Sequence, residues 1–213
     1  MKALNVTLGL TLLLAVATGC DSSINKSVYV QDGERRDGGI NTVNGNITIG
    51  NDCIIRGDCR TVNGSIRVGQ NSLVQGLQVV NGDIEIGQNS KARDDVTTVN
   101  GSITLHVGAK AAGDLASING NLTMDHAIAE RDLSLFNGNV MLANASLVKG
   151  DIIIKDSKRH SSAQQYITIR LGPGSVVEGD IRVLENEVKV KVYLGKDARV
   201  GGEITNAEVI RET

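Results

Sequence analysis

The chain is poor in aromatic residues and in proline. Its 213 residues include no Trp, one Phe, three Tyr and one Pro, so aromatic side chains make up only 2%. Few side chains are therefore available to stack on sugar rings or on nucleic-acid bases. The net charge of -2 also provides no basic excess for a phosphate backbone. Both properties argue against nucleic acid as a partner.

The apolar residues that remain are almost all aliphatic. Hydrophobic residues make up 40% and charged residues 22% of the chain, which is too apolar for a disordered protein. A packed core must therefore consist of Val, Ile, Leu and Ala, which pack well on regular, closely repeated backbone. The length suits one domain of ordinary size or two small ones.

The first twenty residues read as a secretory leader. Lys2 precedes an apolar run of about ten residues, Leu8 to Ala17, whereas spanning a bilayer takes ~20 residues. The run ends in Ala17-Thr18-Gly19-Cys20, which resembles the lipobox of bacterial lipoproteins, although that family more often has Leu where Ala17 stands. The resemblance implies that residues 1–19 are a cleaved signal peptide and that Cys20 is lipidated. The alternatives are an ordinary leader that leaves Cys20 as a free thiol, or a buried first strand.

Lipidation of Cys20 implies a protein of the bacterial cell envelope, facing the periplasm or the outside. Its partner would be the membrane, reached through the lipid, and the polar residues 20–38 are expected to form a linker. Export would also place Cys53 and Cys59 in an oxidising compartment. They lie six residues apart with Gly57 between them, which allows a disulfide. The alternative is a metal pair, but no His or third thiol lies near.

A motif of the type Thr-Val-Asn-Gly recurs six times along the chain. Its asparagines lie 19, 18, 19, 19 and 18 residues apart, at Asn44, Asn63, Asn81, Asn100, Asn119 and Asn137. A short alternating segment such as Ile47-Thr48-Ile49 follows each motif, and the early repeats continue into a second turn such as Gly69-Gln70-Asn71. Each repeat is therefore built from short strands and turns.

Two architectures are compatible with this repeat. Asn-Gly is a strong hairpin signal, which favours an antiparallel meander or barrel. However, the outgoing segments have about four residues while the return path from Ser72 to Val80 has nine, so neighbouring strands would not match. In a parallel β-helix each repeat is one coil, and equivalent residues stack ~4.8 Å apart.

We therefore predict an all-β fold, a single-stranded parallel β-helix of about eight coils over residues 39–205. The six asparagines would form an amide ladder at one corner, and each following glycine would supply left-handed backbone. After Asn137 a corner of the type Gly-Asp-Ile recurs at intervals of 29 and 23 residues, which predicts wider coils and a loop over residues 155–165. Residues 206–213 are expected to form a charged end piece that caps the last coil.

The repeats at Leu171 to Ile181 and Leu194 to Ile204 resemble those of the bactofilin, or polymer-forming cytoskeletal, family. That family consists of right-handed β-helices that associate end to end, so the resemblance implies a right-handed helix and a homo-oligomer formed by coil stacking. The leader is a departure, because bactofilins typically work in the cytoplasm. The Asn-Gly half, with Gly39-Ile40-Asn41, equally resembles β-helical adhesin heads, which implies an envelope glycan or protein as partner.

Few features of the chain suggest catalysis. Ile49-Gly50-Asn51-Asp52-Cys53 resembles one unit of the hexapeptide acyltransferases, but that left-handed fold needs three units per coil and each repeat here has one. His106 and His126 could lie on neighbouring coils, and four acids follow related corners and could stack to hold calcium: Asp83, Asp151, Asp180 and Glu203. There is no nucleophile elbow, phosphate loop, HExxH or paired CxxC. We expect no catalytic residue, metal ligand or cofactor.

The sequence therefore predicts a non-enzymatic, membrane-anchored lipoprotein of the cell envelope. Its β-helix would act as a structural scaffold or as a self-assembly module. The alternative is a surface adhesin or glycan-binding β-helix. An envelope polysaccharide hydrolase or lyase, or an acyltransferase, is a weaker alternative.

Overall fold

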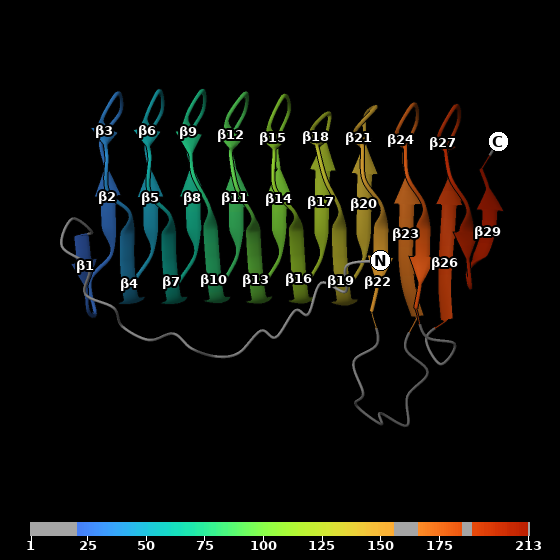
Figure 1. The fold of residues 1–213 in the computed structure, drawn as a ribbon, viewed down its shortest axis with the longest axis horizontal. Coiled ribbons are helices and arrows are strands. Elements are labelled where there is room, and N and C mark those ends of the chain that lie inside the picture. Colours follow the sequence, from blue (N-terminus) through green and yellow to red (C-terminus); the bar gives the residue numbers. More distant parts are fainter. Residues whose placement is uncertain (1–20, 156–165, 185–188, 213) are drawn as a thin grey trace, which may run out of the picture.

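The chain folds into a parallel β-solenoid (Figure 1). In this computed structural model the described residues are 21–155, 166–184 and 189–212. Within these ranges the regular elements are all β-strands, and they form three parallel sheets. We name these sheets A, B and C in the order in which the chain first enters them.

Sheets A and B have ten strands each. Sheet A consists of β1 (Asp21–Ser23), β4 (Ile40–Asn44), β7 (Cys59–Asn63), β10 (Leu77–Asn81), β13 (Val96–Asn100), β16 (Leu115–Asn119), β19 (Leu133–Asn137), β22 (Ile152–Ile154), β25 (Ile181–Val183) and β28 (Ile204–Thr205). Sheet B consists of β2 (Val28–Val30), β5 (Ile47–Ile49), β8 (Ile66–Val68), β11 (Ile84–Ile86), β14 (Ile103–Leu105), β17 (Leu122–Asp125), β20 (Val140–Ala143), β23 (Tyr166–Leu171), β26 (Lys189–Leu194) and β29 (Glu208–Arg211).

Sheet C has nine short strands. They are β3 (Arg35–Arg36), β6 (Ile54–Ile55), β9 (Leu73–Val74), β12 (Lys91–Ala92), β15 (Lys110–Ala111), β18 (Ile128–Ala129), β21 (Leu147–Val148), β24 (Val176–Val177) and β27 (Arg199–Val200). Because each coil contributes one strand to each sheet, the described chain makes nine complete turns. A tenth coil contributes only β28 and β29. The predicted all-β parallel β-helix is confirmed, with one to two coils more than the eight expected.

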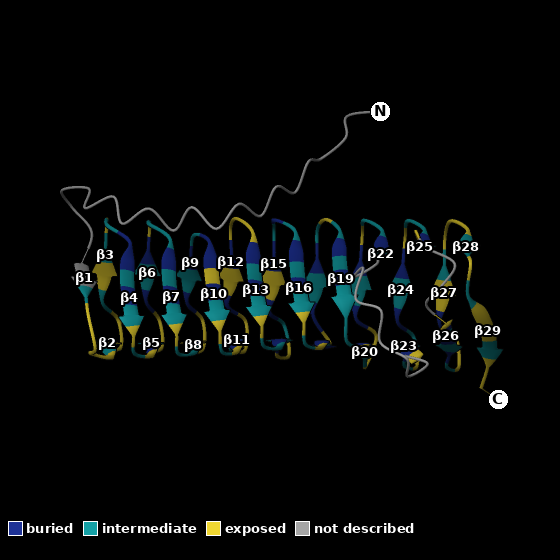
Figure 2. Cartoon of the chain, turned by 90° about the horizontal axis from the view of Figure 1, so that it is seen from below, coloured by how far each residue is buried: buried dark blue, intermediate teal, exposed yellow. Residues whose placement is uncertain are grey.

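The period of 18 to 19 residues keeps equivalent positions in register from coil to coil. Asn81 of β10 pairs with Asn63 of β7 on one side and with Asn100 of β13 on the other. Inward-facing residues therefore stack on residues of the same kind, such as Ile84 on Ile66 and Ile103. The hydrophobic core of the described residues is aliphatic apart from two Cys and one Met, and eight buried Ser and Thr residues accompany it. Figure 2 shows that buried segments recur from coil to coil along the solenoid.

The solenoid extends beyond both of its predicted boundaries. The segment 20–38, expected as a linker, contains β1, β2 and β3, and Val28 to Val30 pair with Ile47 to Ile49. The sequence concealed this coil because Lys26 stands where the later coils have the glycine of Asn-Gly. The end piece 206–213 contains β29, which pairs with β26 as the last strand of sheet B. Of the loop expected at 155–165, residues 156–165 lie outside the described residues.

Candidate functional site

The corner between sheets A and B carries a continuous amide ladder. The Nδ2 atom of each asparagine donates to the Oδ1 atom of the asparagine one coil earlier, at 2.7 to 2.8 Å, through Asn44, Asn63, Asn81, Asn100, Asn119 and Asn137. The structure therefore brings together all six asparagines of the repeat. Asn25 extends the ladder by one coil, since Asn44 Nδ2 lies 2.5 Å from Asn25 Oδ1. The sequence did not reveal Asn25, because no glycine follows it.

The ladder is a structural device. An amide has both a donor and an acceptor, so each asparagine can donate to one neighbour and accept from the other. Apart from the partly covered Asn137 these side chains are exposed, so each bond contributes about 0.5–1.5 kcal/mol at most. The ladder therefore fixes the register of the coils, and its amide groups are engaged with one another.

The glycine that follows each asparagine was predicted to supply left-handed backbone, but this is not the feature that all six glycines share. Gly64, Gly82, Gly120 and Gly138 have φ between 138° and 158°, but Gly45 and Gly101 are not among the positive-φ glycines. All six share a close approach of consecutive coils. A Cβ atom on Gly101 would lie 1.9 Å from the carbonyl oxygen of Gly82. Glycine is therefore required here because the backbones of adjacent coils nearly touch.

A second ladder, built from carboxylates, occupies the corner between sheets C and A. Asp95 Oδ1 accepts from the backbone N–H of Asp114 at 2.8 Å, and Asp132 and Asp151 accept in the same way from the acid one coil later. Asp180 Oδ1 likewise accepts from the N–H of Glu203 at 2.9 Å. Ion pairs with Arg131 and Arg182 neutralise part of this charge. Four of the carboxylates, those of Asp95, Asp132, Asp151 and Asp180, therefore hold the corner through the backbone of the next coil, whereas that of Asp114 forms the ion pair with Arg131.

The predicted stack of four acids is only partly formed. Asp151, Asp180 and Glu203 share the corner between sheets C and A, but Asp83 lies at the corner between sheets A and B. There its carboxylate accepts from the backbone N–H of Ser102 at 2.7 Å. The prediction that all four acids stack was wrong because a similar Gly-acid-Ile motif occurs at both corners. Asp95, Asp114 and Asp132 were missed, although each directly precedes a core residue of sheet A.

The two histidines follow strands of neighbouring coils but form no cluster. His106 follows β14 and His126 follows β17, and both side chains are exposed. His126 Nδ1 lies 2.8 Å from the backbone oxygen of Asn144. Within the described part of the chain, no group of three or more His, Cys, Asp or Glu residues could hold a metal ion.

Cys53 and Cys59 are free, buried thiols, so the disulfide considered for them is not formed. Cys53 lies in the turn between β5 and β6, and its backbone N–H donates to Ser72 Oγ at 2.9 Å, in a column that continues to Ser90. Cys59 begins β7 and pairs with Ile40 and Leu77. Each cysteine thus fills an inward position that other coils fill with a different residue, and the two positions belong to different columns of the core.

We expect both thiols to be unreactive in the folded protein. Burial, and then the negative charge of Asp58, raise the pKa of the Cys59 thiol to about 12, against 9.0 for its ordinary value. A colorimetric thiol reagent at pH 8 should therefore detect no thiol in native residues 21–213 and two thiols after denaturation. Rapid reaction of the native protein would contradict the burial.

The same shift makes stability dependent on pH. Between pH 9 and 12 the unfolded Cys59 loses its proton while the folded one keeps it, so its contribution to stability falls as the pH rises. The slope is about 1.4 kcal/mol per pH unit. Denaturant unfolding at pH 8 and pH 10.5 should show this loss in the wild type and a smaller loss in Cys59→Val. Parallel losses in the two proteins would assign the effect to other groups.

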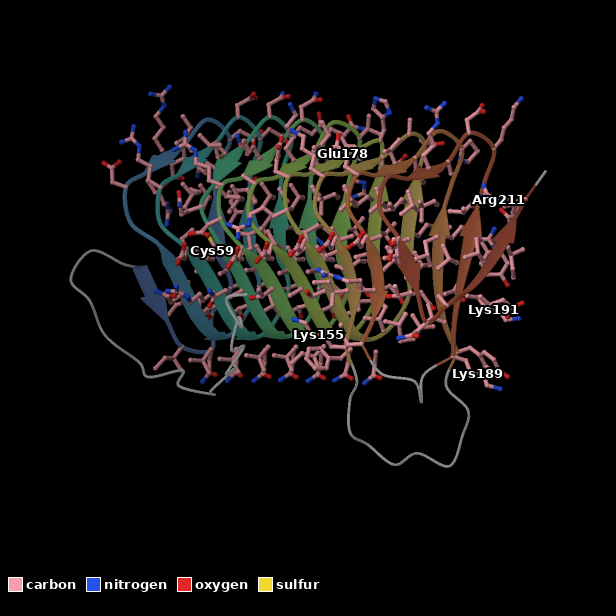
Figure 3. All side chains as sticks on the ribbon, turned by 45° about the vertical axis from the view of Figure 1, so that its right-hand side comes forward. Cys59, Lys155, Glu178, Lys189, Lys191 and Arg211 are labelled. Carbon is pink, nitrogen blue, oxygen red and sulfur yellow. The ribbon has the colours of Figure 1, made fainter. Side chains whose placement is uncertain are left out.

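Aromatic and basic side chains meet on the outer face of β23 and β26. The Arg170 guanidinium lies 4.5 Å from the centre of the Tyr193 ring, and Lys189 Nζ lies 6.0 Å from that of Tyr166. Lys189 and Lys191 project from this C-terminal part of the solenoid (Figure 3). Two of the three tyrosines of the chain thus share one surface, although the composition argued against stacking surfaces.

The described part of the chain has no helix of sufficient length and apolar character to cross a membrane. Cys20, the proposed lipidation site, lies outside the described residues. Comparison of the chain with models of known families, with curated proteins and with solved structures gave no match. The likeness to bactofilins and adhesin heads therefore rests on the β-helical repeats alone.

Proposed function

We propose that the chain is a non-enzymatic structural rod of the bacterial cell envelope, anchored to the membrane by lipid on Cys20. The observation that carries the proposal is the unbroken solenoid, in which all three sheets run from the first coil to the ninth. Ten coils at ~4.8 Å each give a rod of about 45 Å. Such a rod acts by geometry, because it holds whatever binds its faces or its far end at a fixed distance from its base.

The position of the first strand supports a rigid attachment. β1 begins at Asp21, directly after Cys20 in the sequence, and pairs with β4 as part of sheet A. A lipid on Cys20 would therefore hold the first coil beside the membrane without a long tether. Several acyl chains at one terminus provide the multiple signals that stable anchoring needs.

The C-terminal end supports a scaffold more than an end-to-end polymer. The edge strand β29 and the residue after it carry Glu208, Arg211 and Glu212, and charges on an edge strand oppose pairing with another chain. Arg170 and Lys191 form ion pairs with Glu212 and Glu208, which fold these charges back onto the preceding coils.

The anchor can be tested in the full chain expressed in a bacterium. We expect the wild type to incorporate a labelled fatty acid and to sediment with membranes until detergent releases it. Cys20→Ser should remove the label and release the protein into the soluble fraction, while Cys53→Ser serves as the control that keeps both properties. Membrane attachment that survives in Cys20→Ser would overturn the anchor.

An adhesin or glycan-binding role is the second candidate. It is favoured by the surface of Tyr166, Tyr193 and their neighbouring cations, since aromatic rings beside basic groups suit acidic sugars. However, two of its cations, Arg170 and Lys191, are already paired with acids of the same chain. The structural role therefore ranks first.

A further inference from the structure

An apolar column runs along the outer face of sheet A. In the strands of the Thr-Val-Asn type, the first residue is buried and the second faces outward. The register of sheet A places one outward apolar residue in each of seven consecutive coils: Ile24, Val43, Val62, Val80, Val99, Ile118 and Phe136. We call these seven residues the sheet A column.

The column is most exposed at its first residue, and a lysine interrupts it after its last. Ile24 is 65% exposed, while the residues from Val43 to Phe136 are half-buried because each is flanked by the coils on either side. After Phe136 the next coil has Lys155, whose Nζ lies 5.9 Å from the centre of the phenyl ring. The ninth coil restores an apolar residue, Leu184, which is 57% exposed.

The core does not explain this column. The inward neighbours of Val43, Val62 and Val99 are hydroxyl residues, Thr42, Thr61 and Thr98, which are 3 to 5% exposed. Val80 differs, because its inward neighbour is Val79. Thr61 Oγ1, for example, donates to the carbonyl oxygen of Gly45 at 2.9 Å. The usual arrangement of a sheet with one solvated face, apolar inside and polar outside, is therefore reversed at this position.

Stacking along the rod does not explain the column either. The outer column of sheet B lies in the same coils and is under the same stacking constraint. Its residues in the first six coils are almost all polar: Tyr29, Thr48, Arg67, Glu85, Thr104 and Thr123. The seventh coil has an exposed apolar residue, Met141. A solenoid of this kind thus tolerates polar outer columns, and the apolar one on sheet A requires a separate cause.

The charges on this face allow a second copy to approach. From β4 to β19 the outward positions of sheet A include no acid and a single cation, Arg60. Asp58 neutralises that cation at 2.5 Å. The other outward residues beside the column are small or uncharged, such as Gln78, Thr97 and Ala116. Two such faces would meet without repulsion between like charges.

We propose that the outer face of sheet A is a homodimer interface, in which the sheet A column of one copy packs on that of a second copy. Seven coils at ~4.8 Å and strands of five residues at ~3.3 Å give about 550 Å² per copy. The total of about 1,100 Å² lies in the range of weak, transient interfaces. A membrane fits the face less well, because short, half-buried valines cannot insert between lipids as bulky side chains do.

The two rods of a symmetric dimer can pack parallel or antiparallel, and one contact between the copies is the same in both arrangements. A two-fold axis parallel to the rod places every coil on the same coil of the second copy, and an axis parallel to the strands reverses the order of the seven coils. In both cases Val80, in the fourth coil, meets Val80 of the second copy. Val43 meets Val43 only in the first case, because reversal brings it to Ile118.

The association can be measured on residues 21–213, which contain every described strand. Sedimentation of the wild type should show a dimer with a dissociation constant of about 1–100 µM. Val62→Lys with Val99→Lys should weaken it at least tenfold, because two charges would be buried without partners. The matched control, Thr48→Lys with Thr104→Lys, makes the same change on sheet B and should leave it unchanged. Thermal unfolding checks that both variants are folded.

Cross-linking provides a second measurement that needs no destabilising charge. Because Cys53 and Cys59 are buried, Val80→Cys adds an accessible thiol to residues 21–213, and mild oxidation should link two copies. Thr104→Cys should remain unlinked, and Val43→Cys reports the direction of docking. The proposal is overturned if the wild type stays monomeric at several hundred micromolar. It is also overturned if a dimer forms whose stability is unaffected by the sheet A substitutions and which is not linked through Val80→Cys. Residue 20 is absent from this experiment, so its outcome is independent of the anchor.

Discussion

Gly82→Ala should destabilise the solenoid by about 3 kcal/mol or more. Gly82 has a φ of 147°, and a Cβ atom there would lie 2.2 Å from the carbonyl oxygen of Gly64 in the preceding coil. The obstructing atom belongs to the backbone, so no side-chain rotation can relieve the clash. The two coils would have to separate at the corner, which would also stretch the bond between Asn81 and Asn63.

Gly33→Ala is the matched control for this effect. Gly33 also has a positive φ, of 76°, but an added Cβ atom would meet nothing within 4 Å. Its cost should be limited to the strain of the backbone, about 1–2 kcal/mol. Denaturant unfolding of both variants measures the difference, and equal losses would show that close packing of the coils is not the reason for glycine at Gly82.

Ile84→Ala should cost about 2–5 kcal/mol, because it leaves a cavity in a fully buried column. Ile84 is 0% exposed and pairs with Ile66 and Ile103 in the coils on either side. Since each coil of a solenoid contacts only its neighbours, a defect in the fourth coil weakens the contacts on both sides of it.

The tenth coil provides the comparison for Ile84→Ala. Val209 is 42% exposed and has a coil on one side only, so Val209→Ala should cost less than about 1 kcal/mol. Chemical denaturation followed by far-ultraviolet circular dichroism measures both changes. A similar loss in the two variants would contradict the assignment of stability to contacts between internal coils.

The fold could be predicted from the sequence because a constant period stacks equal residues. The spacing of the six asparagines determined the class, the approximate number of coils and the ladder at one corner. The first coil was missed because its corner has Asn25-Lys26 in place of Asn-Gly. The two cysteines suggested a disulfide because the sequence shows that they lie six residues apart, but not that each faces the core in its own column.

The surfaces could not be predicted in the same way. In the Thr-Val-Asn segments hydropathy alone places valine in the core and threonine outside, whereas the structure has the opposite arrangement at this corner. The inward threonine is stable because its hydroxyl finds a backbone carbonyl of the preceding coil, as Thr98 does with Gly82 at 3.1 Å. The path of the backbone around the corner determines which residue faces inward. The alternation of apolar and polar residues in the sequence does not show that path.

Because equivalent residues stack from coil to coil, the length of the molecule changes only in steps of one coil. Each added coil of 18 or 19 residues raises the free end by one strand spacing, ~4.8 Å, and leaves every other contact in place. Extra residues inserted at a corner leave the height unchanged, as the 29-residue interval between Gly150 and Gly179 illustrates. Loss or gain of whole coils would therefore change the reach of the protein in fixed increments, whereas a single residue inserted within a strand would reverse which side chains face the core.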